Sequence, residues 1–179
     1  MKVLITEEQI ARRVRELGEE ITAYYDGKPL TVVILMNGAL PFGADLVRAV
    51  KLPLRWDTFS CSSYSGDRSS EKMNVRGKLK NPVTGRHLLI VDDVLDTGFT
   101  LKTIGEDMLK SGALSVRTCV LLNKNISGKY YIKPDWTGFD IPDKYVVGYG
   151  LDSEEEYRNL PYIAVKDSAL KNHISSHKI

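Results

Sequence analysis

The chain has 179 residues, of which 42% are hydrophobic and 27% charged, and its formal net charge at pH 7 is +2. These values are typical of one soluble domain. The small net charge excludes a strong positive surface potential that would attract nucleic acid or membranes, so we expect neither as a partner. The start, MKVLITEEQI, is too poor in apolar residues for a signal peptide, and no apolar run approaches the ~20 residues of a membrane span.

The N-terminal part predicts a helix followed by a buried strand. Thr6 and Gln9 fit a capping box at the start of a helix over residues 6–27, in which apolar side chains recur at helical spacing. The run LTVVILM at 30–36 is short, apolar and β-branched, which is typical of a strand that is covered on both faces.

The next segment predicts an edge strand and a long polar connection. The turn NGALPFG leads from the first strand into a second helix over 44–50. The roughly alternating run at 54–64 indicates an edge strand. Residues 62–81 are polar and too many for an ordinary connection, so we expect either a functional lid or a loose hairpin.

Strands and helices alternate again in the second half. The predicted order is a buried strand at 87–91, a helix at 100–110, a strand at 115–124, a Pro/Gly-rich loop at 133–144 and a last strand at 145–152. This alternation favours an α/β fold with a mostly parallel central sheet flanked by helices. Because ligands in such folds bind beyond the carboxyl ends of the strands, we expect the functional site there.

The stretch VDDVLDTGFT contains a turn that suits an anion. Residues 96–100 join a buried strand to a helix, whose first backbone N–H groups lack internal partners and carry partial positive charge. Gly98 allows a ligand to approach the backbone closely, and Thr97 and Thr100 add hydroxyl donors. The turn is therefore a candidate phosphate site that needs no basic side chain.

The acids Asp92, Asp93 and Asp96 in the same stretch need a different partner. Carboxylates accept hydrogen bonds from sugar hydroxyls and bind Mg²⁺, often through its waters. Each acid taken alone also fits a helix cap or a solvated turn. Together with the phosphate turn, the three acids indicate a phosphorylated sugar that arrives with Mg²⁺.

The sequence LLIVDDVLDTGFTL resembles the phosphoribosyl pyrophosphate (PRPP) motif of type I phosphoribosyltransferases. That motif is an apolar strand, two acids, two apolar residues and Asp-Thr-Gly-x-Thr, and every position matches. The resemblance implies that Asp92 and Asp93 hold the ribose hydroxyls and that Asp96 is the general base for a purine proton. The PRPP contacts that it implies are Asp92, Asp93, Asp96, Thr97, Gly98, Phe99 and Thr100.

The segment PDWTGFDIPDKYVVGYGLDSEEEYRNLPYIAV closely resembles the base-binding hood of hypoxanthine-guanine phosphoribosyltransferases, and the likeness runs over about residues 30–165. It implies purine salvage, in which the 5-phosphoribosyl group of PRPP passes to hypoxanthine or guanine, giving IMP or GMP plus pyrophosphate. The implied organisation is one domain over 1–179, with a core at about 25–140, a hood from the N-terminal segment and about 141–179, and a mobile lid at about 62–81.

The resemblance also implies how a purine is held. Lys124 would donate to the 6-oxo group and so select hypoxanthine or guanine against adenine. Tyr145 would stack on the ring, Val146 would offer backbone groups to its edge, and Asp152 would bind the metal or the ring edge. Taken alone, these residues also fit a surface lysine, a core aromatic and a turn acid. The implied purine contacts are Lys124, Lys144, Tyr145, Val146 and Asp152.

Pyrophosphate would be bound by a loop, the lid and an arginine. The implied contacts are Asn37, Gly38, Ser63, Tyr64 and Arg158. Well-known members carry a lysine where this chain has Asn37, so the charge of the loop is lost. We expect binding through backbone N–H groups to persist because Gly38 is kept. Arg158 alone also fits an exposed ion pair with the preceding glutamates.

The expected cofactor is Mg²⁺, with Asp92, Asp93 and Asp152 as its ligands. As in the family, we expect a homodimer or homotetramer that acts on small molecules, and we place it in the cytoplasm. Cys61 and Cys119 fit no metal or disulfide spacing and are expected to be free thiols of a reducing compartment.

Two other functions fit the same fold. A regulator that senses PRPP or a nucleotide would bind nucleic acid, although this chain shows no added helix-turn-helix module and little net positive charge. A phosphoribosyltransferase that prefers xanthine would differ at the purine 2-position, which is read partly by backbone groups.

Overall fold

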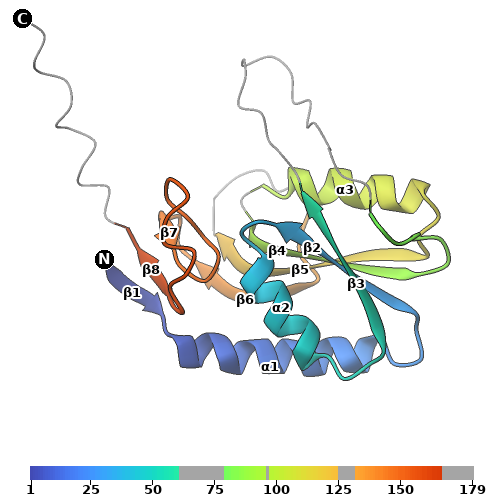
Figure 1. The fold of residues 1–179 in the computed structure, drawn as a ribbon, viewed down its shortest axis with the longest axis horizontal. Helices are drawn as coiled ribbons and strands as arrows, with labels where there is room; N and C mark the ends of the chain where they lie inside the picture. The colour runs from blue at the N-terminus through green and yellow to red at the C-terminus, as the bar shows by residue number, and fades with distance from the viewer. Residues whose placement is uncertain (61–78, 96, 125–131, 167–179) are drawn as a thin grey trace, which may run out of the picture.

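A five-stranded sheet in which every neighbouring pair is parallel forms the centre of the molecule (Figure 1). The computed structural model describes residues 1–60, 79–95, 97–124 and 132–166. The predicted α/β fold with a mostly parallel sheet is confirmed, and the run expected at the sheet edge is an edge strand. In spatial order the strands are β3 (Leu54–Ser60), β2 (Leu30–Met36), β4 (His87–Leu95), β5 (Ser115–Lys124) and β6 (Trp136–Ile141).

Helices cover both faces of this sheet. They are α1 (Glu7–Tyr24) and α2 (Leu40–Ala49) on one face and α3 (Phe99–Lys110) on the other (Figure 1). Side chains of β2 alternate between the two layers. Val32 and Ile34 belong to the apolar cluster with α1 and α2, whereas Val33 and Leu35 belong to the cluster with α3. A strand buried on both faces is what the continuous apolar run predicts.

Thr6 caps α1 as predicted. Its hydroxyl accepts from Gln9 N at 3.3 Å, while Gln9 Oε1 accepts from Thr6 N at 2.8 Å, so both ends of the capping box are formed. The strands predicted at 30–36 and 115–124 agree with β2 and β5, and the helix predicted at 100–110 corresponds to α3.

Two other elements differ from the prediction. The helix expected at 44–50 begins earlier, within the expected turn, because Pro41 lies in the first turn of α2, where its missing N–H costs no helical hydrogen bond. The loop expected at 133–144 is wrong, since it contains β6, which pairs with β5. Gly138 lies in this strand because its backbone approaches β5 closely. A Cβ there would lie 2.4 Å from the Leu121 carbonyl oxygen.

A second, smaller sheet lies at the left of Figure 1. It is antiparallel, and its strands in order are β1 (Lys2–Ile5), β8 (Ile163–Val165) and β7 (Val146–Val147). No strand was predicted at β1. The strand predicted at 145–152 is wrong beyond β7, because Gly148, Tyr149 and Gly150 all have positive φ angles and form a turn. Segments from both ends of the described chain thus meet in this small sheet.

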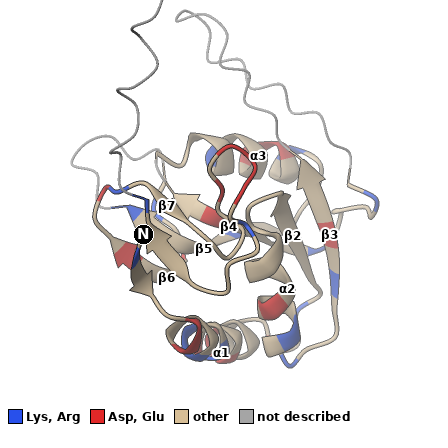
Figure 2. Ribbon diagram, turned by 60° about the vertical axis from the view of Figure 1, so that its left-hand side comes forward, with Lys and Arg blue, Asp and Glu red and all other residues tan. Residues whose placement is uncertain are grey.

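Acidic and basic residues are interspersed along the described part of the chain. Figure 2 shows both kinds along the coloured ribbon. Among the helices that the structure describes, none has both the length and the apolar character that crossing a membrane requires.

Candidate active site

Several of the predicted ligand-binding residues lie at the carboxyl ends of three neighbouring strands. Gly38 follows β2, Asp93 lies near the end of β4, and Lys124 is the last residue of β5. The parallel register sets the ends of β4 and β5 side by side, with Leu95 opposite Asn123. The site therefore lies where open α/β sheets bind their ligands.

The turn before α3 has the form expected of an anion site. Gly98 is the N-cap of α3 with a φ of 79°, a conformation that favours glycine, and its carbonyl oxygen accepts from Lys102 N at 3.0 Å. In α3, which is described in full, the first turn contains no acid that would repel an anion. A cavity of about 210 Å³ lies at this helix start. Its wall is formed by Asp92, Val94, Leu95, Thr97, Gly98, Phe99, Thr100 and Leu101.

Asp92 and Asp93 face different parts of the site. Both lie inside β4, which continues past the strand predicted at 87–91 as far as Leu95. Asp92 lines the cavity at the start of α3. The Asp93 carboxylate lies on the other side, against Gly38, where an added Cβ would come within 1.9 Å of Asp93 Oδ2. This division follows from the alternation of side chains along a strand.

Asp93 is a partly buried acid with fixed hydrogen bonds. Val94 N donates to its Oδ1 at 2.9 Å, and Asp93 N donates to Asp92 Oδ1 at 3.0 Å. Burial raises the pKa of Asp93 above its ordinary value, whereas its hydrogen bonds with Asp92 and Val94 and the charge of Arg158 oppose that rise. Asp93 therefore takes up a proton more readily than an exposed aspartate would.

Lys124 lies largely inside the fold. Its side chain is 17% exposed, and its ammonium group lies 3.5 Å from Asp143 Oδ1. The alternative reading as an ordinary surface lysine is therefore wrong. Asp143 was not singled out in the sequence, although its position directly before Lys144, a predicted purine contact, is a signal that could have found it.

The other expected purine contacts surround β7. Lys144 and Tyr145 directly precede this strand and are exposed, and Val146 is its first residue. Tyr145 is 51% exposed, so it is not a core aromatic. Its hydroxyl donates to the Asp152 carbonyl oxygen at 3.2 Å. The half-exposed ring is available for stacking on a planar ligand.

Arg158 connects Asp152 to the turn at Gly150. Its Nη1 lies 3.0 Å from Asp152 Oδ1 and donates to the Gly150 carbonyl oxygen at 2.8 Å. Its Nη2 pairs with Glu155 at 3.1 Å, so the alternative of an ion pair with a preceding glutamate describes only part of its contacts. Glu155 N in turn donates to Asp152 Oδ2 at 3.0 Å, which makes these residues one cluster.

Several predicted residues lie outside the part of the chain that the structure describes. They are Asp96, Ser63, Tyr64, Cys61 and most of the expected lid, and their roles stay predictions. Cys119, by contrast, is a free thiol in the core, and burial raises its pKa above the usual range.

The carboxylates suit a metal ion that is bound jointly with a substrate. Among the described residues, no group of three His, Cys, Asp or Glu side chains could hold a metal. Mg²⁺ is commonly held by one or two carboxylates together with phosphate oxygens and water, so it needs no all-protein cage. Asp92 beside the anion cavity and Asp152 beside Arg158 fit that donor set, whereas Asp93 lies against Gly38.

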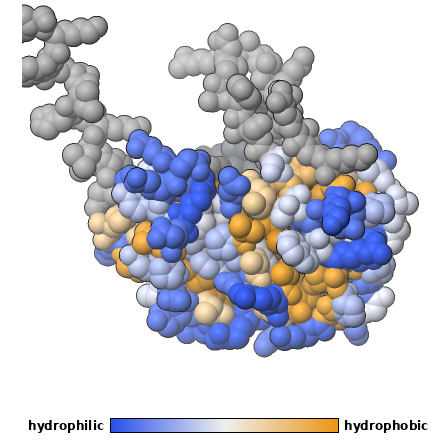
Figure 3. Space-filling model, in the orientation of Figure 1, coloured by the Kyte–Doolittle hydropathy of each residue, from blue (hydrophilic) through white to orange (hydrophobic). Residues whose placement is uncertain are grey.

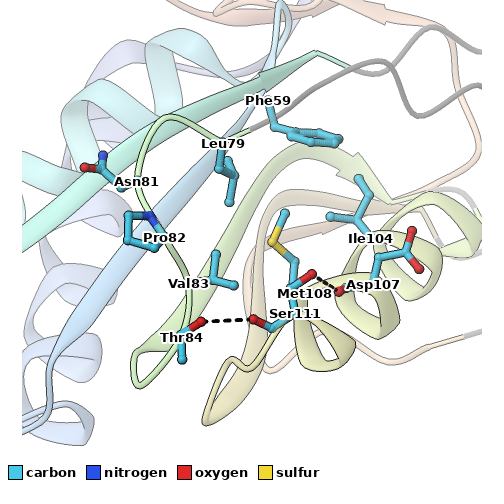
Figure 4. A pocket seen from close by; sticks show the side chains of 10 residues that line it. All are labelled: Phe59, Leu79, Asn81, Pro82, Val83, Thr84, Ile104, Asp107, Met108 and Ser111. Carbon is cyan, nitrogen blue, oxygen red and sulfur yellow. Dashed lines mark hydrogen bonds between the residues drawn. The ribbon is translucent and has the colours of Figure 1, made fainter.

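A larger cavity of about 390 Å³ lies elsewhere, between residues 79–84 and α3 (Figure 4). Leu79, Val83 and Met108 contribute to its apolar wall. Two hydrogen bonds join polar residues of its wall: Thr84 Oγ1 donates to the Ser111 carbonyl oxygen at 3.2 Å, and Ser111 Oγ donates to the Asp107 carbonyl oxygen at 2.8 Å.

Comparison with known proteins gives concordant results. The model of the phosphoribosyl transferase domain matches residues 4–154. A hypoxanthine-guanine phosphoribosyltransferase of Bacillus subtilis is 44% identical over 171 residues, which cover 94% of each chain. A hypoxanthine-guanine-xanthine phosphoribosyltransferase of Tritrichomonas foetus is 36% identical and covers 92% of this chain and 90% of its own. A crystal structure of a Staphylococcus aureus hypoxanthine phosphoribosyltransferase matches with a TM-score of 0.88 at 38% identity, covering 93% of this chain and 91% of that one.

Proposed function

The chain belongs to the phosphoribosyltransferase family, and we propose that it is a hypoxanthine-guanine phosphoribosyltransferase of purine salvage. It transfers the 5-phosphoribosyl group of PRPP to hypoxanthine or guanine, giving IMP or GMP and pyrophosphate. The observation that carries the proposal is the cavity at the start of α3, whose wall combines an anion-binding helix start with the carboxylate of Asp92. Such a wall suits a phosphate and the hydroxyls of the sugar that carries it.

Each end of PRPP has its own partners in this proposal. The 5′-phosphate is bound at residues 97–100 by backbone N–H groups and threonine hydroxyls. Asp92 and Asp93 accept hydrogen bonds from the ribose hydroxyls, and the Asp93 carboxylate also lies against Gly38. The pyrophosphate group lies between that loop and Arg158, whose guanidinium supplies the positive charge that Asn37 lacks.

The chemical step is a substitution at the anomeric carbon. A purine nitrogen attacks from the face opposite pyrophosphate, and the carbon–oxygen bond to pyrophosphate breaks with inversion. The acids of β4 favour the positive charge that develops on the ribose. Asp96, which lies outside the described residues, accepts the proton that the purine N7 loses. Asp92 and Asp152 would hold Mg²⁺ jointly with the substrate, and the charge of the bound ion would neutralise the pyrophosphate leaving group.

Recognition of the purine depends on Lys124 and Tyr145. The ammonium group of Lys124 only donates, so it favours a 6-oxo group over the 6-amino group of adenine. Its pairing with Asp143 limits the positions that the ammonium group takes up. Tyr145 offers a half-exposed ring on which the purine stacks.

A preference for xanthine is the second candidate. The relative from Tritrichomonas foetus, whose name includes xanthine, favours it. The two candidates share the PRPP site and Lys124, because xanthine also carries a 6-oxo group. They differ in what binds the 2-oxo group of xanthine.

We further propose that the chain forms a homodimer or homotetramer in the cytoplasm. Figure 3 shows an apolar area where α2 and β3 lie, and Leu40 and Trp56 on these elements are 42% and 56% exposed. Contiguous apolar surface of this kind often marks a contact with another chain. The free thiol of Cys119 fits a reducing compartment.

Steady-state rates with PRPP, Mg²⁺ and each of four bases test the proposal. We expect IMP from hypoxanthine, GMP from guanine and no nucleotide from adenine. A comparable rate with xanthine would favour the second candidate. No nucleotide from any of the four bases would overturn the assignment as an enzyme of this class.

A further inference from the structure

The side chain of Tyr149 joins the turn after β7 to α2. Its hydroxyl donates to Asp45 Oδ2 at 2.6 Å, and the residue is only 9% exposed. The other carboxylate oxygen of Asp45 accepts from Arg48, so the acid is held by two partners. Burial and the bond to Asp45 raise the pKa of Tyr149, which keeps its hydroxyl a donor throughout the working range.

This bond fixes where the turn meets the loop after β2. Gly150 follows Tyr149, and a Cβ on it would lie 1.9 Å from the Gly38 carbonyl oxygen and 2.9 Å from Pro41 Cδ. The two backbones are therefore in direct contact. Gly38 lies just before α2, the helix that carries Asp45. Asp45 therefore belongs to the helix that directly follows the loop at Gly38. Tyr149 belongs to the turn whose backbone contacts this loop.

The same turn holds Arg158 in place. The Gly150 carbonyl oxygen accepts from Arg158 Nη1 at 2.8 Å, and Gly150 N donates to the Arg158 carbonyl oxygen at 3.0 Å. Tyr149 N also donates to the Leu160 carbonyl oxygen at 2.8 Å. A shift of Tyr149 would therefore move Arg158 relative to Gly38.

We propose that Tyr149 and Asp45 are positioning residues for the pyrophosphate end of the site, because their hydrogen bond sets Arg158 against the loop at Gly38. This inference rests on the proposed function, in which Arg158 and Gly38 bind pyrophosphate. Neither Tyr149 nor Asp45 is assigned a contact with substrate. Misplacing a binding group by as little as ~1 Å is enough to weaken its interaction with the ligand many-fold.

The test compares variants that remove or keep this one bond. Tyr149→Phe and Asp45→Ala each remove it, whereas Asp45→Asn keeps an acceptor oxygen. We expect the first two to raise the Kd and the KM for PRPP about 5- to 10-fold, the factor expected for one hydrogen bond. We expect kcat and the KM for hypoxanthine to change less than about twofold, and Asp45→Asn to restore most of the PRPP affinity.

Tyr25→Phe is the matched control. Tyr25 is fully buried, and its hydroxyl donates to the Leu88 carbonyl oxygen at 3.5 Å near the start of β4, at the end of the sheet away from the site. This variant should lose some thermal stability and keep the PRPP affinity of the wild type. The double variant Tyr149→Phe/Asp45→Ala should bind PRPP no more weakly than either single variant, because both remove the same bond.

Calorimetric titration with PRPP distinguishes a failure of the positioning role from a failure of the proposed function. If the wild type binds PRPP and Tyr149→Phe binds it equally well, Tyr149 is merely structural and the inference is overturned. Additive losses in the double variant, or equal losses in Tyr25→Phe, would also overturn it. If the wild type itself neither binds PRPP nor makes a nucleotide, the proposed function is wrong and the inference falls with it.

Discussion

The carboxylate of Asp93 fills the space in which a side chain on Gly38 would begin. An ideal Cβ on Gly38 would lie 1.9 Å from Asp93 Oδ2 and 2.7 Å from its Cγ, far inside contact distance. The carboxylate is not free to swing away, because Val94 N donates to its other oxygen at 2.9 Å. The loop after β2 and the acidic end of β4 therefore form one unit.

Gly38→Ala should displace either this loop or the Asp93 carboxylate, and it should weaken PRPP binding about 10-fold or more. Calorimetric titration with PRPP measures the loss. Gly105→Ala is the control, since its new methyl group would meet Val116 Cγ1 at an ordinary 3.4 Å and alanine suits the interior of a helix. Equal PRPP affinity in wild type and Gly38→Ala would show that this close contact is not needed.

Asp93→Asn should raise the melting temperature of the free protein at neutral pH. Burial raises the pKa of Asp93 in the folded chain above its value in the unfolded chain. The folded chain therefore favours the protonated carboxyl group of Asp93. This contribution to stability is complete below the pKa of Asp93 in the unfolded chain, and it is lost as the pH rises through the pKa of Asp93 in the folded chain. Asparagine lacks this charge, so its advantage should be largest near pH 7 and should shrink toward about pH 4.

Scanning calorimetry of wild type and Asp93→Asn at both pH values measures this difference. A gain of about 1 kcal/mol corresponds to roughly 2–4 °C for a chain of this size. A variant that melts below the wild type at neutral pH would mean that the hydrogen bonds of the carboxylate outweigh its burial.

Lys124→Gln should lower kcat/KM for hypoxanthine about 10- to 100-fold, the worth of a hydrogen bond from a charged donor. Asp143→Asn should cost less, because its carboxylate is 61% exposed and the pair is 3.5 Å apart. Lys110→Gln, at an exposed position near the end of α3, serves as the control. If Lys124→Gln keeps the wild-type ratio of the rates with hypoxanthine and adenine, another group recognises the 6-position of the purine.

Asp96→Asn should lower kcat about 10²- to 10⁴-fold while PRPP still binds, because a general base acts only in the proton transfer. Single-turnover rates and a PRPP titration on the same preparation separate the two effects. Turnover at the wild-type rate would remove Asp96 from the role of base.

The elements that the sequence predicts correctly have local signals. Thr6 and Gln9 mark the start of α1 by their own spacing, and the apolar run of β2 is recognisable without its neighbours. β1 was missed because its pairing depends on a segment far along the chain, with Lys2 opposite Val165. β6 was missed because it contains a glycine that only its contact with β5 explains.

The candidate site shows the same difference between features with a local sequence signal and features that depend on distant contacts. The motif names Asp92 and Asp93 as functional acids, and alternation predicts that they face apart, but no local pattern indicates that Gly38 lies against Asp93. Tyr149 and Asp45 are 104 residues apart, so their hydrogen bond follows only from the packing of the turn after β7 on α2. Sequence motifs thus identify residues that touch a ligand better than residues that position them.

A competition between two bases distinguishes transfer to a 6-oxopurine from transfer to adenine in a single reaction. The protein is supplied with PRPP, Mg²⁺ and equal concentrations of hypoxanthine and adenine, and the nucleotides formed are identified by mass. We expect IMP and pyrophosphate in equal amounts, with little or no AMP. AMP as the main product, or pyrophosphate release without any nucleotide, would contradict it.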